Sequence, residues 1–102
     1  MTKLRMQREE TQDALVLALA GALTSDTATR FLRELDEALK QGPSRLVLDL
    51  HAIEEMDSAG AAALVEAWAR ANRQGIPLQL QALSAAARTR LAIVGVLDHL
   101  AA

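Results

Sequence analysis

The chain has 102 residues, enough for one compact domain and too few for two separate cores. Hydrophobic residues make up 51% of it and aromatic residues only 2%, which argues against disorder and predicts a core of Leu, Val, Ile and Ala. The formal net charge of −2, without a basic cluster, argues against nucleic acid or anionic lipid as a partner. The chain has no cysteine, which excludes disulfides and thiolate metal sites.

The N-terminal segment and the apolar runs indicate a cytoplasmic protein. The basic residues at the start are followed by Glu9 and Glu10 and not by an apolar run, so no signal peptide is predicted. The longest apolar run, residues 14–23, has half the roughly 20 residues that a membrane helix needs. Direct membrane insertion is therefore not expected.

Two strands are predicted at the start of the chain. Leu4 and Met6 alternate with polar residues, as in a strand with one solvated face, and residues 9–13 supply a polar turn. Residues 15–20, bounded by Gly21, are apolar at every position, which is typical of a strand covered on both sides. The two strands are expected to form a hairpin, with the second near the centre of the sheet.

A first helix is predicted between residues 24 and 43. Thr24 or Ser25 is expected to cap its N-terminus, and Gly42 and Pro43 end it. Its inward stripe consists of Ala28, Phe31, Leu32, Leu35 and Leu39. Two outward pairs of opposite charge lie four residues apart, Arg30 with Glu34 and Asp36 with Lys40.

Two further strands and two further helices are predicted in the rest of the chain. They are a buried strand over 46–50, a helix from Ser58 to about Arg73, an alternating strand over 78–82 and a helix that Ser84 caps and that runs to about Val94. The inward residues of these helices are expected to be Ala61, Leu64, Val65, Trp68 and Ala69 in the first, and Ala87, Leu91 and Val94 in the second. Glu66 is expected to pair with Arg70, and Val96, Leu97 and Leu100 to form a last turn. The strand, helix, strand order favours parallel pairing, so the sheet should be mixed.

The candidate functional site is the turn into the second helix, which holds Asp57, Ser58, Ala59 and Gly60 after Met56. Function in open α/β sheets collects beyond the carboxyl ends of parallel strands, and a helix N-terminus favours negative charge. A phosphate on Ser58 would add about −1.5 to −2 charge there. The alternative is that Ser58 or Asp57 merely caps the helix.

The apolar strand 46–50, followed after six residues by Asp57, Ser58, Ala59 and Gly60, resembles the STAS domain family and its anti-sigma-factor antagonists. The similarity covers nearly the whole chain, as one STAS domain over residues 1–102. It implies an α/β fold with a four-stranded mixed sheet, flanking helices and the order β-β-α-β-α-β-α, without catalysis or cofactor. Two positions differ from the common family pattern: Thr24 stands in place of an Asp, and Ala61 in place of a Leu.

The resemblance implies a bacterial regulator of transcription that captures an anti-sigma factor when unphosphorylated. A cognate anti-sigma kinase would phosphorylate Ser58 and release the partner. The expected partner-binding residues are Thr24, Asp57, Ser58, Ala59, Gly60, Ala62 and Ala63, with Ala67 on the same low-relief flank of the helix. The protein itself is expected to be a monomer or a weak dimer.

A second branch of the family remains open, because small STAS subunits also dock on the ATPase subunits of lipid-transport ABC complexes. Residues 64–70, followed by Gln74 and Gly75, are similar to that branch.

A serine hydrolase using Ser58 with Asp49 and His51 is the alternative from a different class. It is disfavoured because a nucleophile elbow needs Gly two residues before the serine, where this chain has Met56. No metal site is predicted, since His51 and His99 lack a third ligand at metal spacing.

Overall fold

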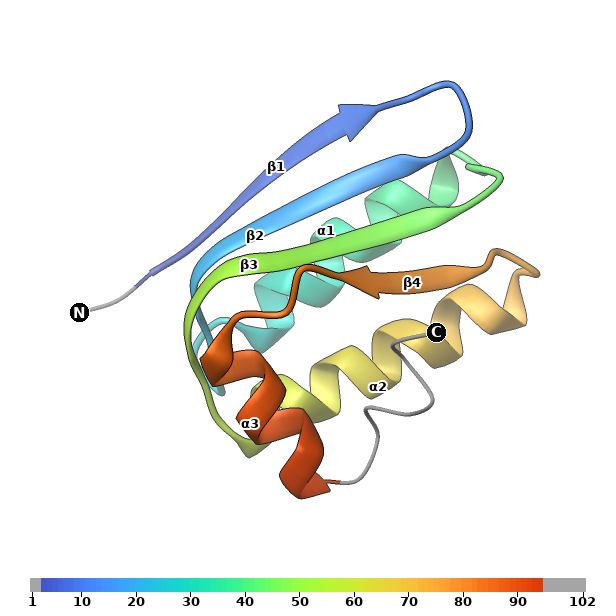
Figure 1. Ribbon diagram of the computed structural model, residues 1–102. Coiled ribbons are helices and arrows are strands. Elements are labelled where there is room, and N and C mark those ends of the chain that lie inside the picture. The colour runs from blue at the N-terminus through green and yellow to red at the C-terminus, as the bar shows by residue number, and fades with distance from the viewer. Residues whose placement is uncertain (1–2, 95–102) are drawn as a thin grey trace.

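The computed structural model describes residues 3–94, apart from the side chains of Ile93 and Val94, and its elements follow the predicted order (Figure 1). The strands are β1 (Leu4–Glu10), β2 (Leu15–Leu23), β3 (Leu46–Met56) and β4 (Leu78–Gln81). The helices are α1 (Ala28–Lys40), α2 (Ser58–Arg73) and α3 (Ala85–Val94). The last turn expected for Val96, Leu97 and Leu100 lies outside the described residues, as does the expected inward position of the Val94 side chain.

The strands form one mixed sheet, as predicted, and their order across it is β1-β2-β3-β4. β1 and β2 pair antiparallel as a hairpin, whereas β2–β3 and β3–β4 pair parallel. β2 runs on through Gly21, where the sequence predicted its end, because Gly21 has φ +99° and the strand takes a register shift beside it. A Cβ at Gly21 would lie 1.9 Å from the carbonyl oxygen of Lys3, so only glycine fits the hairpin there.

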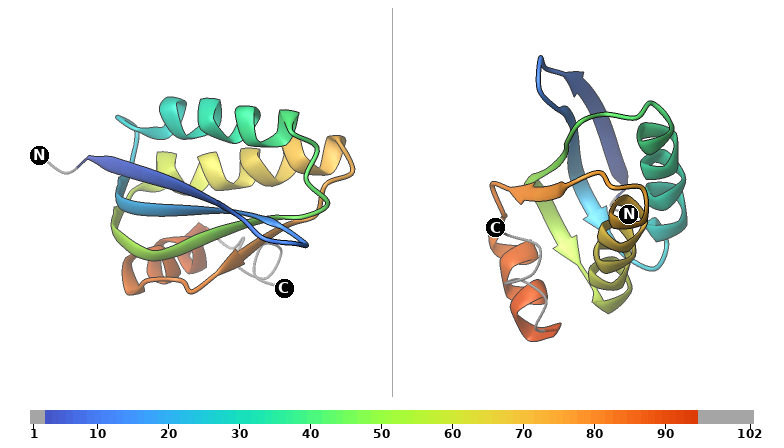
Figure 2. Two further views of the ribbon diagram at one scale, coloured as in Figure 1. Left: turned by 90° about the horizontal axis from the view of Figure 1, so that it is seen from above. Right: turned by 90° about the vertical axis from the view of Figure 1, so that its right-hand side faces the viewer.

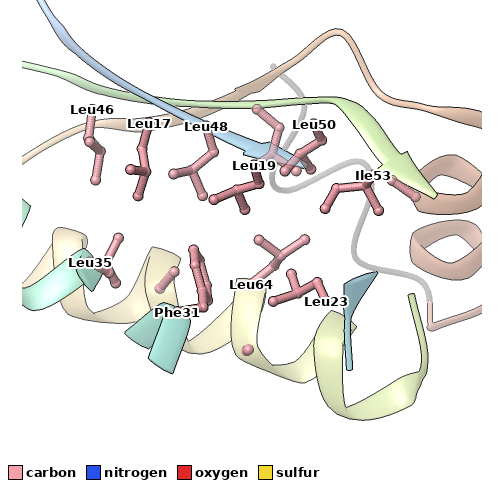
Figure 3. Packing of buried hydrophobic residues seen from close by; sticks show 14 of the residues in the cluster. Leu17, Leu19, Leu23, Phe31, Leu35, Leu46, Leu48, Leu50, Ile53 and Leu64 are labelled. Carbon is pink, nitrogen blue, oxygen red and sulfur yellow. The ribbon is translucent and has the colours of Figure 1, made fainter. Parts of the chain in front are cut away.

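The sheet separates the helices into two layers (Figure 2). α1 and α2 lie side by side on one face, and α3 lies on the other side, beside the carboxyl end of β3. The core between the sheet and the first two helices is almost entirely aliphatic (Figure 3). Its fully buried side chains include Leu17, Leu19, Leu48 and Leu50 from the strands and Phe31, Leu35 and Leu64 from the helices. β2 was predicted to be covered on both sides, but its second face, with Val16, Ala18 and Ala20, is only half-buried.

α1 buries the predicted stripe but begins differently from the prediction. Its first residue is Ala28, whose backbone N–H donates to the Thr24 carbonyl at 2.8 Å, and neither Thr24 nor Ser25 caps it through a side chain. The Thr27 hydroxyl instead donates to the Ala22 carbonyl at 2.9 Å, tying the helix entry to the end of β2. A polar tie to the strand therefore replaces the side-chain cap.

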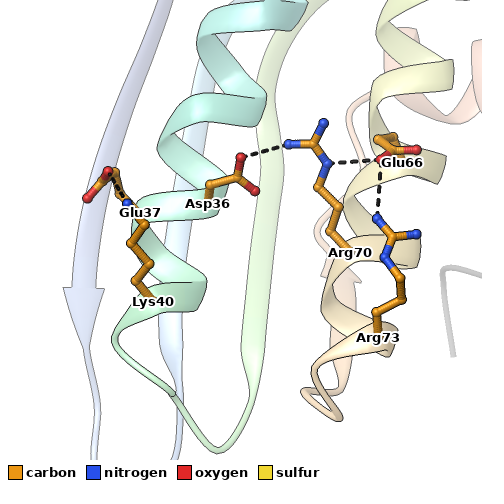
Figure 4. Close-up of polar contacts among 6 residues, drawn as sticks. All are labelled: Asp36, Glu37, Lys40, Glu66, Arg70 and Arg73. Carbon is orange, nitrogen blue, oxygen red and sulfur yellow. Dashed lines mark hydrogen bonds and ion pairs between the residues drawn. The ribbon is translucent and has the colours of Figure 1, made fainter.

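Neither predicted outward ion pair of α1 forms among the described residues. Glu34 pairs with Arg8 of β1 at 3.7 Å, Asp36 with Arg70 of α2 at 2.8 Å, and Lys40 with Glu37 at 3.3 Å. Charges on neighbouring elements compete with the pairs within the helix. The Glu66–Arg70 pair predicted within α2 is present, at 2.9 Å (Figure 4).

α2 begins and ends where predicted, but its buried face is rotated from the predicted one. The buried residues are Gly60, Ala61, Ala63, Leu64, Ala67 and Ala71. Val65 and Trp68, expected to point inward, are each 38% exposed. Small residues on the buried face let α2 lie close to its neighbours, and the two large side chains are left on the outside.

In residues 78–94, the predicted cap of α3 is present, and β4 is shorter than the predicted strand. The Ser84 hydroxyl accepts a hydrogen bond from the Ala87 N–H at 3.1 Å, which is the expected N-cap of α3, and Ala87 and Leu91 are buried. Ala82, predicted within the fourth strand, has φ +56° and lies beyond its end. A non-glycine residue in the left-handed region cannot continue a strand.

Candidate functional site

The candidate site lies at the carboxyl ends of the two central strands. Leu23 and Met56 pair with each other as the last residues of β2 and β3. The turn that starts at Thr24 and the turn at Asp57 that leads into α2 are therefore neighbours (Figure 1). The topology thus brings together two segments about thirty residues apart in the chain, as expected at a parallel sheet edge.

Asp57 joins these two turns. One carboxylate oxygen accepts a hydrogen bond from the Gly60 backbone N–H at 2.8 Å and so caps α2. The other oxygen accepts from the Ser25 backbone N–H at 3.1 Å, across to the turn before α1. The hydrogen bond from Gly60, and the one from Ser25 beside it, lower the pKa of the Asp57 carboxyl. Of the two residues that the sequence offered as the cap of α2, Asp57 and not Ser58 therefore caps the helix.

Gly60 is required by close packing. It is buried, and a Cβ built on it would lie 1.9 Å from the Leu23 carbonyl oxygen and 2.8 Å from its carbonyl carbon. The first turn of α2 thus rests on the backbone at the end of β2. Together, Asp57 and Gly60 hold the helix start in place, and Ser58, one of the two residues between them, is left exposed.

Ser58 is the first residue of α2 and is exposed. Among residues 3–94, no hydrogen bond involves its hydroxyl, because the capping role belongs to Asp57. The hydroxyl is free to meet another molecule, and it stands at a helix N-terminus that favours negative charge. The Ser58 side chain is therefore accessible from solvent in the folded domain.

The remaining predicted site residues differ in exposure. Ala62 is exposed and Ala59 is half-buried, so both can contact a partner. Ala63 and Ala67 are buried in the core, which corrects their expected place on an exposed flank. Thr24 is only 9% exposed, and its hydroxyl accepts a hydrogen bond from the Asp26 N–H at 3.3 Å within its own turn.

Comparison with known proteins decides the family. Residues 6–101 match the family model described as Mlab, STAS domain. The chain belongs to the STAS domain family. No curated protein matches this STAS domain in sequence.

Solved structures share the fold of this STAS domain. An anti-sigma factor antagonist from Mycobacterium paratuberculosis is 19% identical with a TM-score of 0.86, over 96% of this chain and 83% of that one. An RsbS variant from Moorella thermoacetica is 25% identical with a TM-score of 0.78, over 95% and 84%. A sulfate transporter family protein from Wolinella succinogenes is 21% identical with a TM-score of 0.75, over 90% and 75%. The same fold therefore occurs among antagonists and in a transporter family protein.

Arg90 of α3 also contacts the end of β3. Its Nε donates to the Met56 carbonyl at 3.1 Å, so α3 is tied to the last residue of β3, two positions before Ser58. Glu55, Met56, Ala85, Ala86 and Thr89 line an open pocket with Arg90 beside this contact. The contact joins elements 34 residues apart, and no local pattern predicts it.

The residues considered for a hydrolase or a metal site do not form one in the described chain. His51 Nδ1 lies 2.8 Å from Asp49 Oδ1, but among residues 3–94 no hydrogen bond joins His51 to Ser58. Burial raises the pKa of the Asp49 carboxyl, but the hydrogen bonds from His51 lower it by more, so this pKa lies below its ordinary value. Within residues 3–94, no group of three His, Asp or Glu side chains is arranged to hold a metal ion. No helix of the described chain is long and apolar enough to span a membrane.

Proposed function

We propose that this STAS domain is a non-enzymatic regulator that binds a partner protein at the start of α2 and is switched by phosphorylation of Ser58. The observation that carries the proposal is the division of roles in the turn. Asp57 caps the helix and Gly60 packs against Leu23, while the exposed Ser58 hydroxyl takes part in neither contact. A serine that the fold does not use, held between two residues that the fold requires, suits reversible modification.

The charge around Ser58 supports a switch without a large change of shape. Glu54, Glu55 and the Asp57 carboxylate lie within four positions of Ser58, and both glutamates are exposed. A phosphate would add about −1.5 to −2 charge beside them, and a partner seated here would have to desolvate that dianion. Phosphorylation would thus release the partner.

An anti-sigma factor with serine kinase activity is the partner that we propose first. The sequence resembles the antagonist branch of the family, and the similar solved structures include anti-sigma factor antagonists, among them SpoIIAA in its unphosphorylated form at 18% identity. In that role, the unmodified chain captures the anti-sigma factor, and modified Ser58 lets it go.

Docking on the ATPase of a lipid-transport ABC complex is the second candidate. Two observations favour it: the matched family model is described as Mlab and not as an antagonist, and a sulfate transporter family protein shares the fold. In this role Ser58 would lie at a constitutive subunit contact and would carry no phosphate.

The test uses the purified chain with the anti-sigma serine kinases and the lipid-transport ATPase of its source organism. Each kinase is incubated with the chain and ATP, and phosphate is located by mass spectrometry, with Ser58→Ala as the negative variant and Ser25→Ala as the matched control. Ser25 is an exposed serine on the adjacent turn. Phosphate on Ser58 that survives Ser25→Ala supports the switch. A stable complex with the ATPase and no phosphate on Ser58 supports the second candidate. If neither phosphorylation of Ser58 nor a complex with the ATPase is found, both candidates are rejected.

A further inference from the structure

The outer edge of β1 is open to another strand. Among residues 3–94, β1 pairs with β2 and with no other strand, and it lies at the margin of the sheet (Figure 1). At one end of the hairpin the Thr11 N–H donates to the Ala14 carbonyl at 2.8 Å. At the other end the Ala22 N–H donates to the Lys3 carbonyl at 3.2 Å. Odd-numbered residues thus bond to β2, and because successive residues point to opposite sides of a strand, the backbone groups of the even-numbered residues face the edge.

The exposed charges along this edge are separated by sign. Arg5 lies two residues before Gln7, and Glu9 lies two residues after it, and all three side chains are exposed. Neither Arg5 nor Glu9 forms an ion pair within residues 3–94. An edge that is protected against self-pairing carries charges that repel another strand. Opposite charges placed evenly about an uncharged residue instead attract a second copy of the same strand that runs antiparallel.

The backbone geometry limits how two copies of β1 can pair. The even-numbered residues must face each other, so a two-fold axis passes through Met6, Gln7 or Arg8 if most of the strand is to pair. An axis at Arg8 sets two arginines of like charge directly opposite each other, and an axis at Met6 leaves Arg5 opposite an uncharged glutamine. An axis at Gln7 places Arg5 opposite Glu9 of the second copy, and symmetry repeats the pair.

The same register forms a second pair of opposite charges on the other face of the sheet. Arg30 of α1 donates from Nη1 to the Leu4 carbonyl, so its guanidinium lies at the start of the open edge. Pairing about Gln7 sets Glu10 of the second copy opposite Leu4, next to that guanidinium. Glu10 is exposed and forms no ion pair within residues 3–94. The Leu4 carbonyl has a second lone pair with which to accept from the added strand.

We infer that two copies of this chain form a two-fold symmetric dimer by antiparallel pairing of their β1 strands about Gln7, which joins the two sheets into one. The contact is a single strand of seven residues with flanking charges, far smaller than the interface of an obligate dimer. The dimer should therefore be weak and should depend on protein concentration. The contact contains no residue of the proposed site at Ser58, so it is independent of the proposed function.

The first experiment tests the register by disulfide formation, because the chain has no cysteine of its own. In this register Gln7 faces its own copy in a pair without backbone hydrogen bonds, with Cα atoms about 4.5 Å apart, within the range that a disulfide spans. Under mild oxidation Gln7→Cys should form a covalent dimer at least tenfold faster than Asn72→Cys, an exposed control on α2. Arg5→Cys should cross-link with Glu9→Cys but not with itself. Equal rates for Gln7→Cys and Asn72→Cys would overturn the dimer.

The second experiment reverses the charges and measures the dimer by sedimentation equilibrium over a wide range of concentration. Arg5→Glu and Glu9→Arg should each weaken the dimer at least tenfold, and the double variant, in which the pair is exchanged, should return to within threefold of wild type. Arg88→Glu, at an exposed position of α3, should stay within twofold. Thermal melting verifies folding. A wild type that remains monomeric at every concentration, or a dimer that is unchanged in Arg5→Glu, would overturn the inference, and neither result affects the proposed role of Ser58.

Discussion

The Asp57 carboxylate accepts a hydrogen bond from the Ser25 backbone N–H at 3.1 Å, which ties the entrance of α2 to the turn before α1. The same side chain caps α2 through Gly60 at 2.8 Å. One residue thereby fixes two neighbouring turns, and Ser58 is displayed next to it. The geometry of the proposed binding site depends on this residue although its own carboxylate is engaged inside the fold.

Replacing Asp57 should destabilise the domain and loosen both turns. Asp57→Ala removes a helix cap and leaves the Gly60 and Ser25 N–H groups without their acceptor, at a cost of about 1–2 kcal/mol. Asp57→Asn keeps one acceptor oxygen and should cost less. Urea unfolding measures the free energies, and hydrogen exchange at Ser25 and Gly60 should quicken in Asp57→Ala. Equal protection of both amides in wild type and variant would contradict the clamp.

Gly60→Ala gives a test in which the sign of the effect is informative. By helix propensity alone the change should stabilise α2 by about 1 kcal/mol. Since the added Cβ would lie 1.9 Å from the Leu23 carbonyl oxygen, we expect destabilisation instead, on the order of 1–3 kcal/mol. Ala62→Gly, at an exposed position of the same helix, gives the ordinary propensity effect for comparison. A Gly60→Ala variant more stable than wild type would mean that α2 does not lie this close to β2.

Asp57 should also contribute to the pH dependence of stability. Its pKa in the folded state is lowered from the ordinary value of 3.8 by the hydrogen bond from Gly60 and by that from Ser25. The stabilisation is therefore complete above that ordinary value and disappears as the pH falls through the lower folded pKa. The gap in unfolding free energy between wild type and Asp57→Asn should therefore narrow as the pH falls below about 4 and through the lowered folded pKa. A gap that widens on acidification would contradict this.

Arg70 should matter more than Arg73, because only Arg70 bridges the two helices. Arg70 pairs with both Asp36 and Glu66, and the hydrogen bond from Arg70 lowers the pKa of the Glu66 carboxyl. These side chains are partly exposed, so Arg70→Ala should cost at most about 1 kcal/mol, and less in high salt. Arg73→Ala should cost less still. Thermal melting at low and high salt compares the variants, and equal losses at both salt concentrations would argue against an ionic contribution.

The order of strands and helices along the chain and the α1 stripe could be predicted because large aliphatic residues recur there with an unambiguous period. The start of α2 could be predicted too, since Asp57 and Ser58 are both residues that favour an N-cap, although the sequence left open which of them caps the helix. The inward face of α2 could not. Alanine occupies both sides of this helix, and placing Val65 and Trp68 inside assumed that large apolar residues are buried.

The entry of α1 and the contact of Arg90 with Met56 depend on tertiary placement. Thr27 donates to the end of β2, and Arg90 reaches a carbonyl 34 residues away, so neighbouring positions in sequence hold no signal for either contact. Asp36 likewise finds Arg70 across the helix pair and not Lys40 within its own helix. Of the predicted site, Asp57, Ser58 and Gly60 lie together at the α2 start, while Ala63 turned inward because α2 packs through its small residues.

The most direct test of the phospho-switch measures stability and partner binding together in Ser58→Ala and Ser58→Glu. Because the Ser58 hydroxyl has no role in the fold, both variants should unfold within about 0.5 kcal/mol of wild type. Ser58→Ala should bind the partner kinase or ATPase as wild type does, and Ser58→Glu should bind at least tenfold more weakly. Wild-type affinity in Ser58→Glu, with the fold intact, would contradict a switch at Ser58.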